Sequence, residues 1–169
     1  MFKNMSIKKR LILLAIIVVI FGLLSPTPEE KKANEEKRMV ALKVEVLNIS
    51  KLDINKNLEA YKKLSKFYKD DNKYINKYNK YKKLNDIQTY CLAKSVSLNK
   101  GFLNNPNTYN NERFKFSKWL NENEYITNFE FTGKNAFNVE YKFNSQYKCK
   151  IIDIENDKVT IETTFINKI

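Results

Sequence analysis

The sequence predicts an α+β protein. It would have an N-terminal membrane helix, a charged helical stalk and an αα-hairpin, then one helix packed on a four-stranded antiparallel sheet. Three observations lead to this prediction. An apolar run follows a basic cluster near the N-terminus, apolar residues recur at helical spacing between residues 54 and 102, and apolar and polar residues alternate in several later segments. The expected divisions are residues 1–25, 26–50, 51–86 and 87–169.

Composition limits the chemistry that this chain supports. Its 169 residues suit one small domain with appendages, or two very small domains. The net charge of +12 is concentrated in residues 1–10 and 51–86. No histidine is present, which removes the most usual general base and the commonest metal ligand. Two cysteines are too few for a structural zinc site. We therefore expect no metal, no cofactor and no catalytic residue.

Residues 1–25 predict a membrane anchor. Lys8, Lys9 and Arg10 precede an unbroken apolar run over residues 11–24, which spans roughly 21 Å as a helix. Counting from Ile7, with lysine side chains reaching the headgroups, brings residues 7–24 nearer to the bilayer thickness. The alternatives are an uncleaved anchor and a cleaved signal peptide. In both, the N-terminus is cytoplasmic and the C-terminal domain is periplasmic or extracellular.

Helices are expected next. "SPTP" ends the apolar run, and residues 26–50 then read as a charged helical stalk. In residues 51–86, two amphipathic stripes flank the polar stretch "KDDN", which predicts an αα-hairpin with Asp53 and Asp71 as N-caps. This segment resembles a single tetratricopeptide-like unit, which implies a hairpin docked on another element.

The hairpin also carries a basic face. Its tyrosines fall on the apolar stripe, so they are expected in the core, whereas most lysines fall off it. Such a face is either solvated or attracted to anionic lipid headgroups or an acidic partner. The candidate residues are Lys62, Lys63, Lys66, Lys69, Lys77 and Lys80.

Residues 87–169 predict a helix that covers a β-meander. Ile87, Cys91, Ser95, Leu98 and Phe102 line one helical stripe. Four alternating segments follow, and "TGKN" and "ENDK" supply hairpin turns. An antiparallel sheet with one apolar face is naturally covered by a helix.

The two cysteines are expected in the helix–sheet interface. Cys91 lies on the helical stripe, and Cys149 shares a strand register with Tyr147 and Ile151. In an exported domain such thiols oxidise, and a disulfide would stabilise the domain by roughly 4 kcal/mol. Buried free thiols and a reactive Cys91 are the alternatives, although a reactive thiol requires a nearby base or cation.

A family resemblance adds to this reading. Cys91, "NNPNTYNNERF", "GKNAFN" and "QYKCK" are similar to a small domain of uncharacterised envelope proteins of bacteria and their phages. The likeness covers residues 87 to about 154. It implies paired cysteines and an α+β layout, and it carries no activity. Asn138 stands where that group usually has glycine, and asparagine tolerates positive φ better than most residues.

Two loops and one tryptophan are candidate contact sites. Asn105, Pro106 and Tyr109 belong to the first loop, and Asn135 and Phe137 to the second. Loops often carry function, but here Asn and Pro can simply shape turns while Tyr109 and Phe137 plug the sheet edge. Trp119 is either an edge anchor or a contact residue.

Three functions are compatible with these patterns. The first is an exported, membrane-anchored interaction module, without catalysis, that binds an envelope protein or surface. The second is a cell-wall hydrolase, which needs two converging carboxylates, although Glu122, Glu124, Glu130 and Glu140 are expected on the solvated sheet face. The third is a binder of nucleic acid or anionic surfaces through the Lys/Tyr hairpin, and export makes nucleic acid a poor candidate. These sequence patterns predict neither the identity of the partner nor the oligomeric state.

Overall fold

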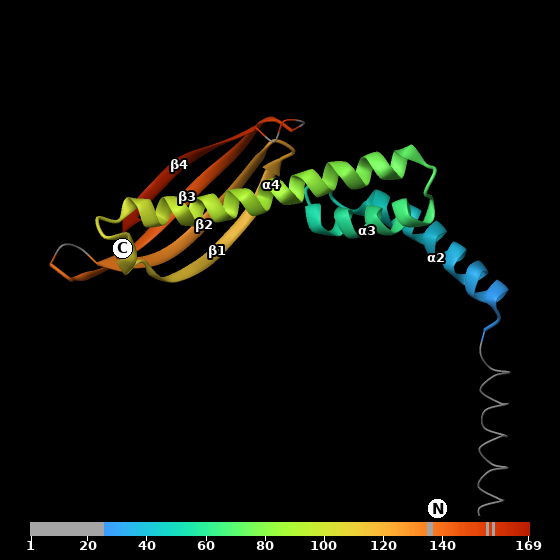
Figure 1. Ribbon diagram of the computed structural model, residues 1–169, viewed down its shortest axis with the longest axis horizontal. Helices are drawn as coiled ribbons and strands as arrows, with labels where there is room; N and C mark the ends of the chain where they lie inside the picture. Colours follow the sequence, from blue (N-terminus) through green and yellow to red (C-terminus); the bar gives the residue numbers. More distant parts are fainter. Residues whose placement is uncertain (1–25, 135–136, 155, 157) are drawn as a thin grey trace, which may run out of the picture. The chain divides into compact units, whose positions relative to one another are not determined.

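The computed structural model describes residues 26–134, 137–154, 156 and 158–169 (Figure 1). The predicted anchor and the candidate residue Asn135 lie outside these ranges. Among the helices in these ranges, none has the combined length and apolar character that a membrane crossing needs. The chain divides into two compact units, residues 1–43 and residues 44–169.

Helix α2, Pro28–Asn48, occupies the predicted stalk and runs through the boundary between the two units. Its start is a reciprocal capping box. The Thr27 amide donates to Glu30 Oε2 at 2.8 Å, and the Glu30 amide donates to Thr27 Oγ1 at 3.2 Å. The side chains from residue 26 to residue 38 are exposed, in keeping with the charged sequence there.

After the end of α2, the second unit contains the expected helical hairpin of α3, Ile54–Phe67, and α4, Asn72–Phe102. Asp53 and Asp71 cap these helices as predicted, accepting from the amides of Lys56 and Lys73. Tyr61 and Tyr81 stack between the helices with ring centroids 5.5 Å apart. The tyrosines of the apolar stripe therefore contribute to packing.

One expectation about the helices is wrong. We predicted separate helices on either side of residue 86, but α4 is continuous over 31 residues. The residues at this point are Asn85 and Asp86, and neither is a proline or a glycine that would interrupt the helix. Leu84, Ile87 and Cys91 are all buried and continue the helical spacing across this point. The first half of α4 packs on α3, and the second half packs on the sheet.

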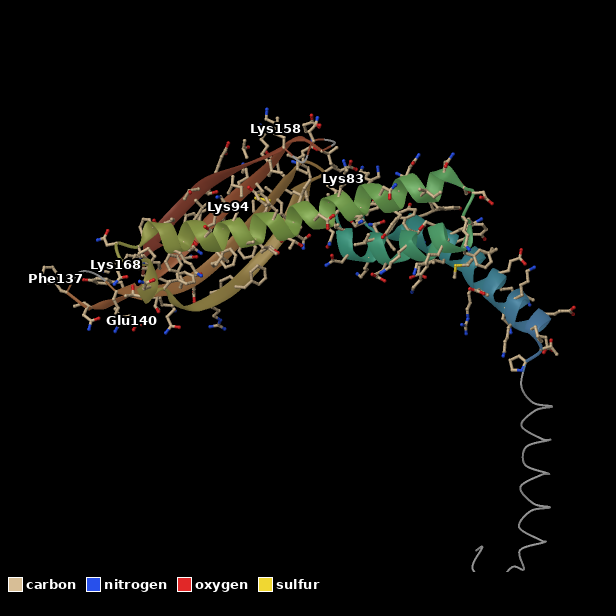
Figure 2. All side chains as sticks on the ribbon, in the orientation of Figure 1. Lys83, Lys94, Phe137, Glu140, Lys158 and Lys168 are labelled. Atoms are coloured by element: carbon tan, nitrogen blue, oxygen red, sulfur yellow. A yellow bond between two sulfur atoms is a disulfide. The ribbon has the colours of Figure 1, made fainter. Side chains whose placement is uncertain are left out.

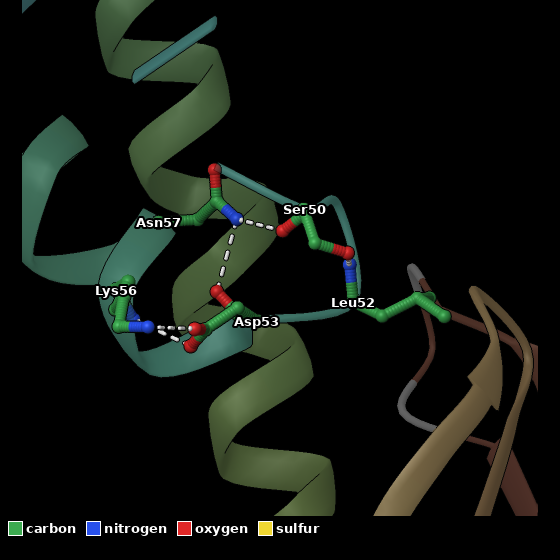
Figure 3. A network of polar contacts seen from close by, with 5 residues as sticks. All are labelled: Ser50, Leu52, Asp53, Lys56 and Asn57. Carbon is green, nitrogen blue, oxygen red and sulfur yellow. Dashed lines mark hydrogen bonds and ion pairs between the residues drawn. The ribbon is translucent and has the colours of Figure 1, made fainter. Parts of the chain in front are cut away.

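The connection between α2 and α3 is closed by a buried asparagine (Figure 3). The Asn57 side-chain amide donates to the carbonyl oxygens of Ser50 at 2.7 Å and Asp53 at 2.9 Å. Beside it, the Lys56 ammonium lies 2.8 Å from the Asp53 carboxylate. Satisfying these carbonyls fixes the direction in which the chain enters α3.

Four antiparallel strands form the predicted meander in the order β1-β2-β3-β4. They are β1, Asn110–Asn121; β2, Glu124–Lys134; β3, Glu140–Asp153; and β4, Lys158–Lys168. The β2–β3 register runs without a shift, whereas the pairings of both edge strands contain irregularities. Such irregularities discourage further strand pairing at an edge.

Helix α4 covers one face of this sheet (Figure 1). Tyr125, Thr127, Phe129 and Phe131 of β2 are all buried, as predicted. Ile126 and Asn128 between them are buried as well, so burial does not alternate in the middle of β2. One cluster of the core joins α3, α4 and the sheet, and the buried members of this cluster are Ile54, Tyr81, Leu84, Ile87, Cys91, Trp119, Tyr125, Cys149 and Ile151.

Candidate functional site

Cys91 and Cys149 form a disulfide between α4 and β3. Their Cα atoms lie 6.2 Å apart, and both side chains are buried in the core. The disulfide prediction is confirmed, and the alternatives of free thiols and of a reactive Cys91 are wrong for this structure, because both sulfur atoms are bonded. The bond joins the helix to the sheet that it covers.

A buried polar cluster lies one to two turns further along α4. Asn99 Oδ1 accepts hydrogen bonds from Ser145 Oγ and from the Tyr147 hydroxyl, each at 2.7 Å. Ser95 Oγ donates a hydrogen bond to the Cys91 carbonyl oxygen at 2.8 Å and lies 3.0 Å from Thr127 Oγ1. Burial raises the pKa of Tyr147 to about 12, so its hydroxyl stays protonated and able to donate. This cluster fixes the register of the helix on the sheet.

The loop of Asn105, Pro106 and Tyr109 is tied to the end of the sheet. It contains the 3₁₀ helix η1, Pro106–Thr108, and Asn105 Oδ1 accepts from the Asn107 amide at 3.2 Å. The Lys134 amide donates to Thr108 Oγ1 at 2.9 Å. The Tyr109 ring packs 5.4 Å from that of Phe131. Asn105 thus shapes the turn and Tyr109 covers the sheet end, which gives this loop a structural role.

Trp119 is an anchor of the edge strand β1. Only 7% of its surface is exposed, and its indole Nε1 donates to Gln88 Oε1 at 3.0 Å. Its ring centroid lies 5.1 Å from that of Tyr125. This packing is that of an edge anchor, and a contact role for Trp119 stays a prediction.

The β2–β3 turn differs from expectation at one residue and agrees at another. Phe137 is 85% exposed, so the expectation that it plugs the sheet edge is wrong. Asn138 has φ of 64°, the left-handed conformation that asparagine was expected to tolerate in place of glycine. Phe137 lies between the last residue of β2, Lys134, and the first residue of β3, Glu140.

The predicted basic face is largely solvent-exposed. Lys62, Lys63 and Lys66 lie on α3, Lys69 lies in the turn after it, and all four are exposed. On α4, Lys77 is exposed, whereas Lys80 is half-buried and lies 2.7 Å from the Glu122 carboxylate of the β1–β2 turn. Lys80 therefore fastens the hairpin to the sheet, while the remaining lysines stay accessible.

Two grooves lie beside the middle of α4 in the second unit. The larger, of about 780 Å³, is lined by Asn79, Lys82, Lys83, Asp86, Ile87, Tyr90 and Val159. The Lys83 ammonium is positioned there by a 3.2 Å hydrogen bond to the Ile154 carbonyl. The smaller, of about 470 Å³, lies between residues 50–55 and β1 and includes Trp119 and Tyr125.

Sequence reasoning missed both grooves because each combines residues from distant segments. Each is lined by one carboxylate, Asp86 or Asp53, whereas the glycosidase mechanism requires a converging pair. In the described ranges, no group of three or more His, Cys, Asp or Glu side chains could hold a metal ion. Asn99 and Gln88 were also missed, although Asn99 follows Ser95 by four residues and so shares its buried helical face.

Two of the four carboxylates named for hydrolysis, Glu122 and Glu130, are engaged with lysines. Glu130 lies 2.8 Å from Lys115 and 3.2 Å from Lys142. The hydrogen bond from Lys115, aided by Lys142, lowers the pKa of Glu130 below its ordinary value of 4.5. The hydrogen bond from Lys80 likewise lowers the pKa of Glu122. Both groups are therefore ionised at neutral pH and serve as ion-pair partners.

The Glu130 ion pairs predict a pH dependence of stability. Because the folded-state pKa lies below the unfolded value, the stabilisation is complete above about pH 4.5 and is lost as the pH falls through the folded pKa. We expect Glu130→Gln to unfold with a shallower pH dependence than the unsubstituted protein between about pH 6 and pH 3. Denaturant midpoints measured across this range provide the check. Equal slopes for the two proteins would contradict the assignment, since every other carboxylate is common to both.

These features define a small disulfide-bonded α+β domain carried by a basic helical hairpin, with two open grooves and no converging carboxylate pair in those grooves. Comparison of the chain with family models, with curated proteins and with solved structures finds no match.

Proposed function

We propose that this protein is an exported, membrane-tethered interaction module that binds an envelope protein or surface. The observation that carries the proposal is the buried disulfide between Cys91 and Cys149. A reducing cytoplasm keeps thiols free, so a structural disulfide favours an oxidising compartment. Residues 8–24, a basic cluster followed by an apolar run, supply the orientation and the anchor that this proposal requires.

The accessible surface supports binding rather than chemistry as the role of the domain. Lys62, Lys63 and Lys66 are exposed on α3, where the Lys62 ammonium lies 3.9 Å from the Glu59 carboxylate. A surface with this excess of ammonium groups attracts anionic partners over roughly one Debye length, about 8–10 Å. The lining of the larger groove adds two lysines, a tyrosine and two apolar side chains beside one aspartate. Such a mixture suits recognition of a polar, negatively charged ligand or protein surface.

Thiol trapping in intact cells tests compartment and orientation together. We expect the full chain, expressed in a bacterial host, to resist alkylation at Cys91 and Cys149 until it is reduced. We also expect protease added outside the inner membrane to degrade residues after 25. Free thiols in cells, or protection of the C-terminal domain, would overturn the export part of the proposal.

Crosslinking in the intact envelope tests the binding part. The full chain is expected to recover a defined partner or envelope polymer. A version whose first 25 residues are replaced by a cleavable export signal separates tethering from recognition. Recovery of nothing by either version would sink the binding part while leaving the topology result standing.

A further inference from the structure

The end of the second unit that carries the β2–β3 turn exposes apolar side chains. Phe137 is 85% exposed, Val139 is 49% exposed, and Phe102 at the end of α4 is 48% exposed. Exposed apolar groups that gather at one place, rimmed by polar residues, mark interaction sites. We call this end the hairpin-end surface and define it by Phe102, Lys134, Phe137, Val139, Tyr141 and Lys168.

Contacts connect the members of the hairpin-end surface. The Phe102 ring lies 5.6 Å from the Phe143 ring, and Phe143 pairs with Lys168 across β3 and β4. The Lys168 ammonium lies 3.2 Å above the centroid of the Tyr141 ring. A depression of about 230 Å³ joins Phe102, Lys134 and Tyr141. Figure 2 shows Phe137, Glu140 and Lys168 at the same end of the sheet, away from Lys158.

The charge of this surface favours an anionic partner. Lys134 and Lys168 belong to it, and Lys100 lies nearby, 5.5 Å from the Tyr109 ring. Lys142 is engaged by Glu130, and Glu140 lies opposite Lys134 in the β2–β3 register. Apolar side chains flanked by cations form the combination that binds the interface of an anionic bilayer.

A lipid surface fits this geometry better than a folded protein does. A stable protein interface buries about 800 Å² on each partner, which a few side chains at a hairpin end and one small depression do not provide. A bilayer requires no such matching area, because individual aromatic and aliphatic side chains enter the interfacial layer while lysines meet the phosphates.

We propose that the hairpin-end surface docks on an anionic lipid bilayer, with Phe137 and Val139 entering the interfacial layer and Lys134 and Lys168 facing headgroup phosphates. The inference goes beyond the proposed function and rests on it only in that a membrane must lie within reach of the domain.

Site-specific fluorescence quenching tests the docking. The full chain is reconstituted into nanodiscs of neutral lipid, so that residues 7–24 are already accommodated, and vesicles with brominated acyl chains are added in trans. We expect vesicles containing phosphatidylglycerol to quench the indole introduced by Phe137→Trp at least tenfold more effectively than phosphatidylcholine vesicles. Salt should weaken the effect.

Ile152→Trp provides the matched control. Ile152 is 50% exposed and precedes Asp153, which lies opposite Lys158 at the end of β3. It therefore lies near the β3–β4 turn, at the opposite end of the meander. The indole introduced there should remain unquenched, and the buried Trp119 common to both proteins gives the baseline. Adding Lys134→Glu and Lys168→Glu to the Phe137→Trp protein should abolish quenching.

Three outcomes would overturn the docking proposal: quenching at neither position, equal quenching at both, or quenching that does not depend on anionic lipid. Because vesicle binding is measured in vitro, its failure leaves the thiol and protease results untouched. Conversely, a cytoplasmic domain with free thiols would sink the proposed function while the vesicle result stands.

Discussion

Loss of the disulfide is expected to lower the free energy of unfolding of residues 44–169 by about 4 kcal/mol. The bond closes a loop with a sequence separation of 58, and the chain-entropy model assigns that amount to the unfolded states it removes. For a small domain whose total stability is about 5–15 kcal/mol, this is a large fraction. The bond also joins two fully buried positions, so its loss loosens the contact between α4 and β3.

The measurement compares urea unfolding of the oxidised protein, the reduced protein and the double variant Cys91→Ala, Cys149→Ala, each in mild detergent. Trp119 reports the transition because it belongs to the same core cluster as the disulfide. The reduced protein isolates the crosslink, and the double variant adds the cost of the two small cavities. Equal midpoints for the oxidised and reduced proteins would show that the bond does not stabilise the domain.

Replacing Phe131 by alanine is expected to cost about 3–5 kcal/mol of stability. Phe131 is fully buried on the face of β2 that α4 covers. Its ring centroid lies 5.2 Å from that of Phe143 and 5.4 Å from that of Tyr109. Truncation would leave a cavity between the central strands, the loop before β1 and the end of α4.

Phe137→Ala is the matched control, because it makes the same chemical change six residues away at an exposed position. We expect it to change the free energy of unfolding by no more than about 0.5 kcal/mol. Thermal unfolding of the two variants under one condition provides the comparison. Similar losses for both would contradict the assignment of Phe131 to the core and Phe137 to the surface.

Local rules predicted much of the fold. Alternation identified Tyr125, Thr127, Phe129 and Phe131 as buried residues of β2, because successive strand side chains point to opposite faces. It did not predict that Ile126 and Asn128 on the other face are buried too. Asp53 and Asp71 were recognisable as caps because a short acidic side chain satisfies orphan amides at a helix start. The pairing of Cys91 with Cys149 followed from two periodicities, one helical and one extended, that place both residues in one interface.

The missed features depend on packing between distant segments. No proline or glycine at residue 86 indicates a break, but the sequence alone did not show that one helix continues through this point. The structure shows a single α4 that packs on both α3 and the sheet. In the sequence, Asn99 interrupts the apolar stripe of the helix. Its role becomes clear from the structure, where Ser145 and Tyr147 of β3 donate hydrogen bonds to it. Gln88 gains its role only from the Trp119 indole. The sequence placed Phe137 near a turn. The alternation of Phe137 with Val139 and Tyr141 did not show that Phe137 lies outside both β2 and β3.

By itself, the sequence determined the α+β class, the order of the strands, the helix caps and the cysteine pair, because each depends on spacing along one segment or on two simple periodicities. Only the tertiary structure decided which side chains the core encloses, where the grooves lie and which apolar residues stay in solvent. Burial is a property of neighbours, and the neighbours of Trp119, Asn99 and Phe137 are set by how α4 crosses the sheet rather than by the residues beside them in the chain.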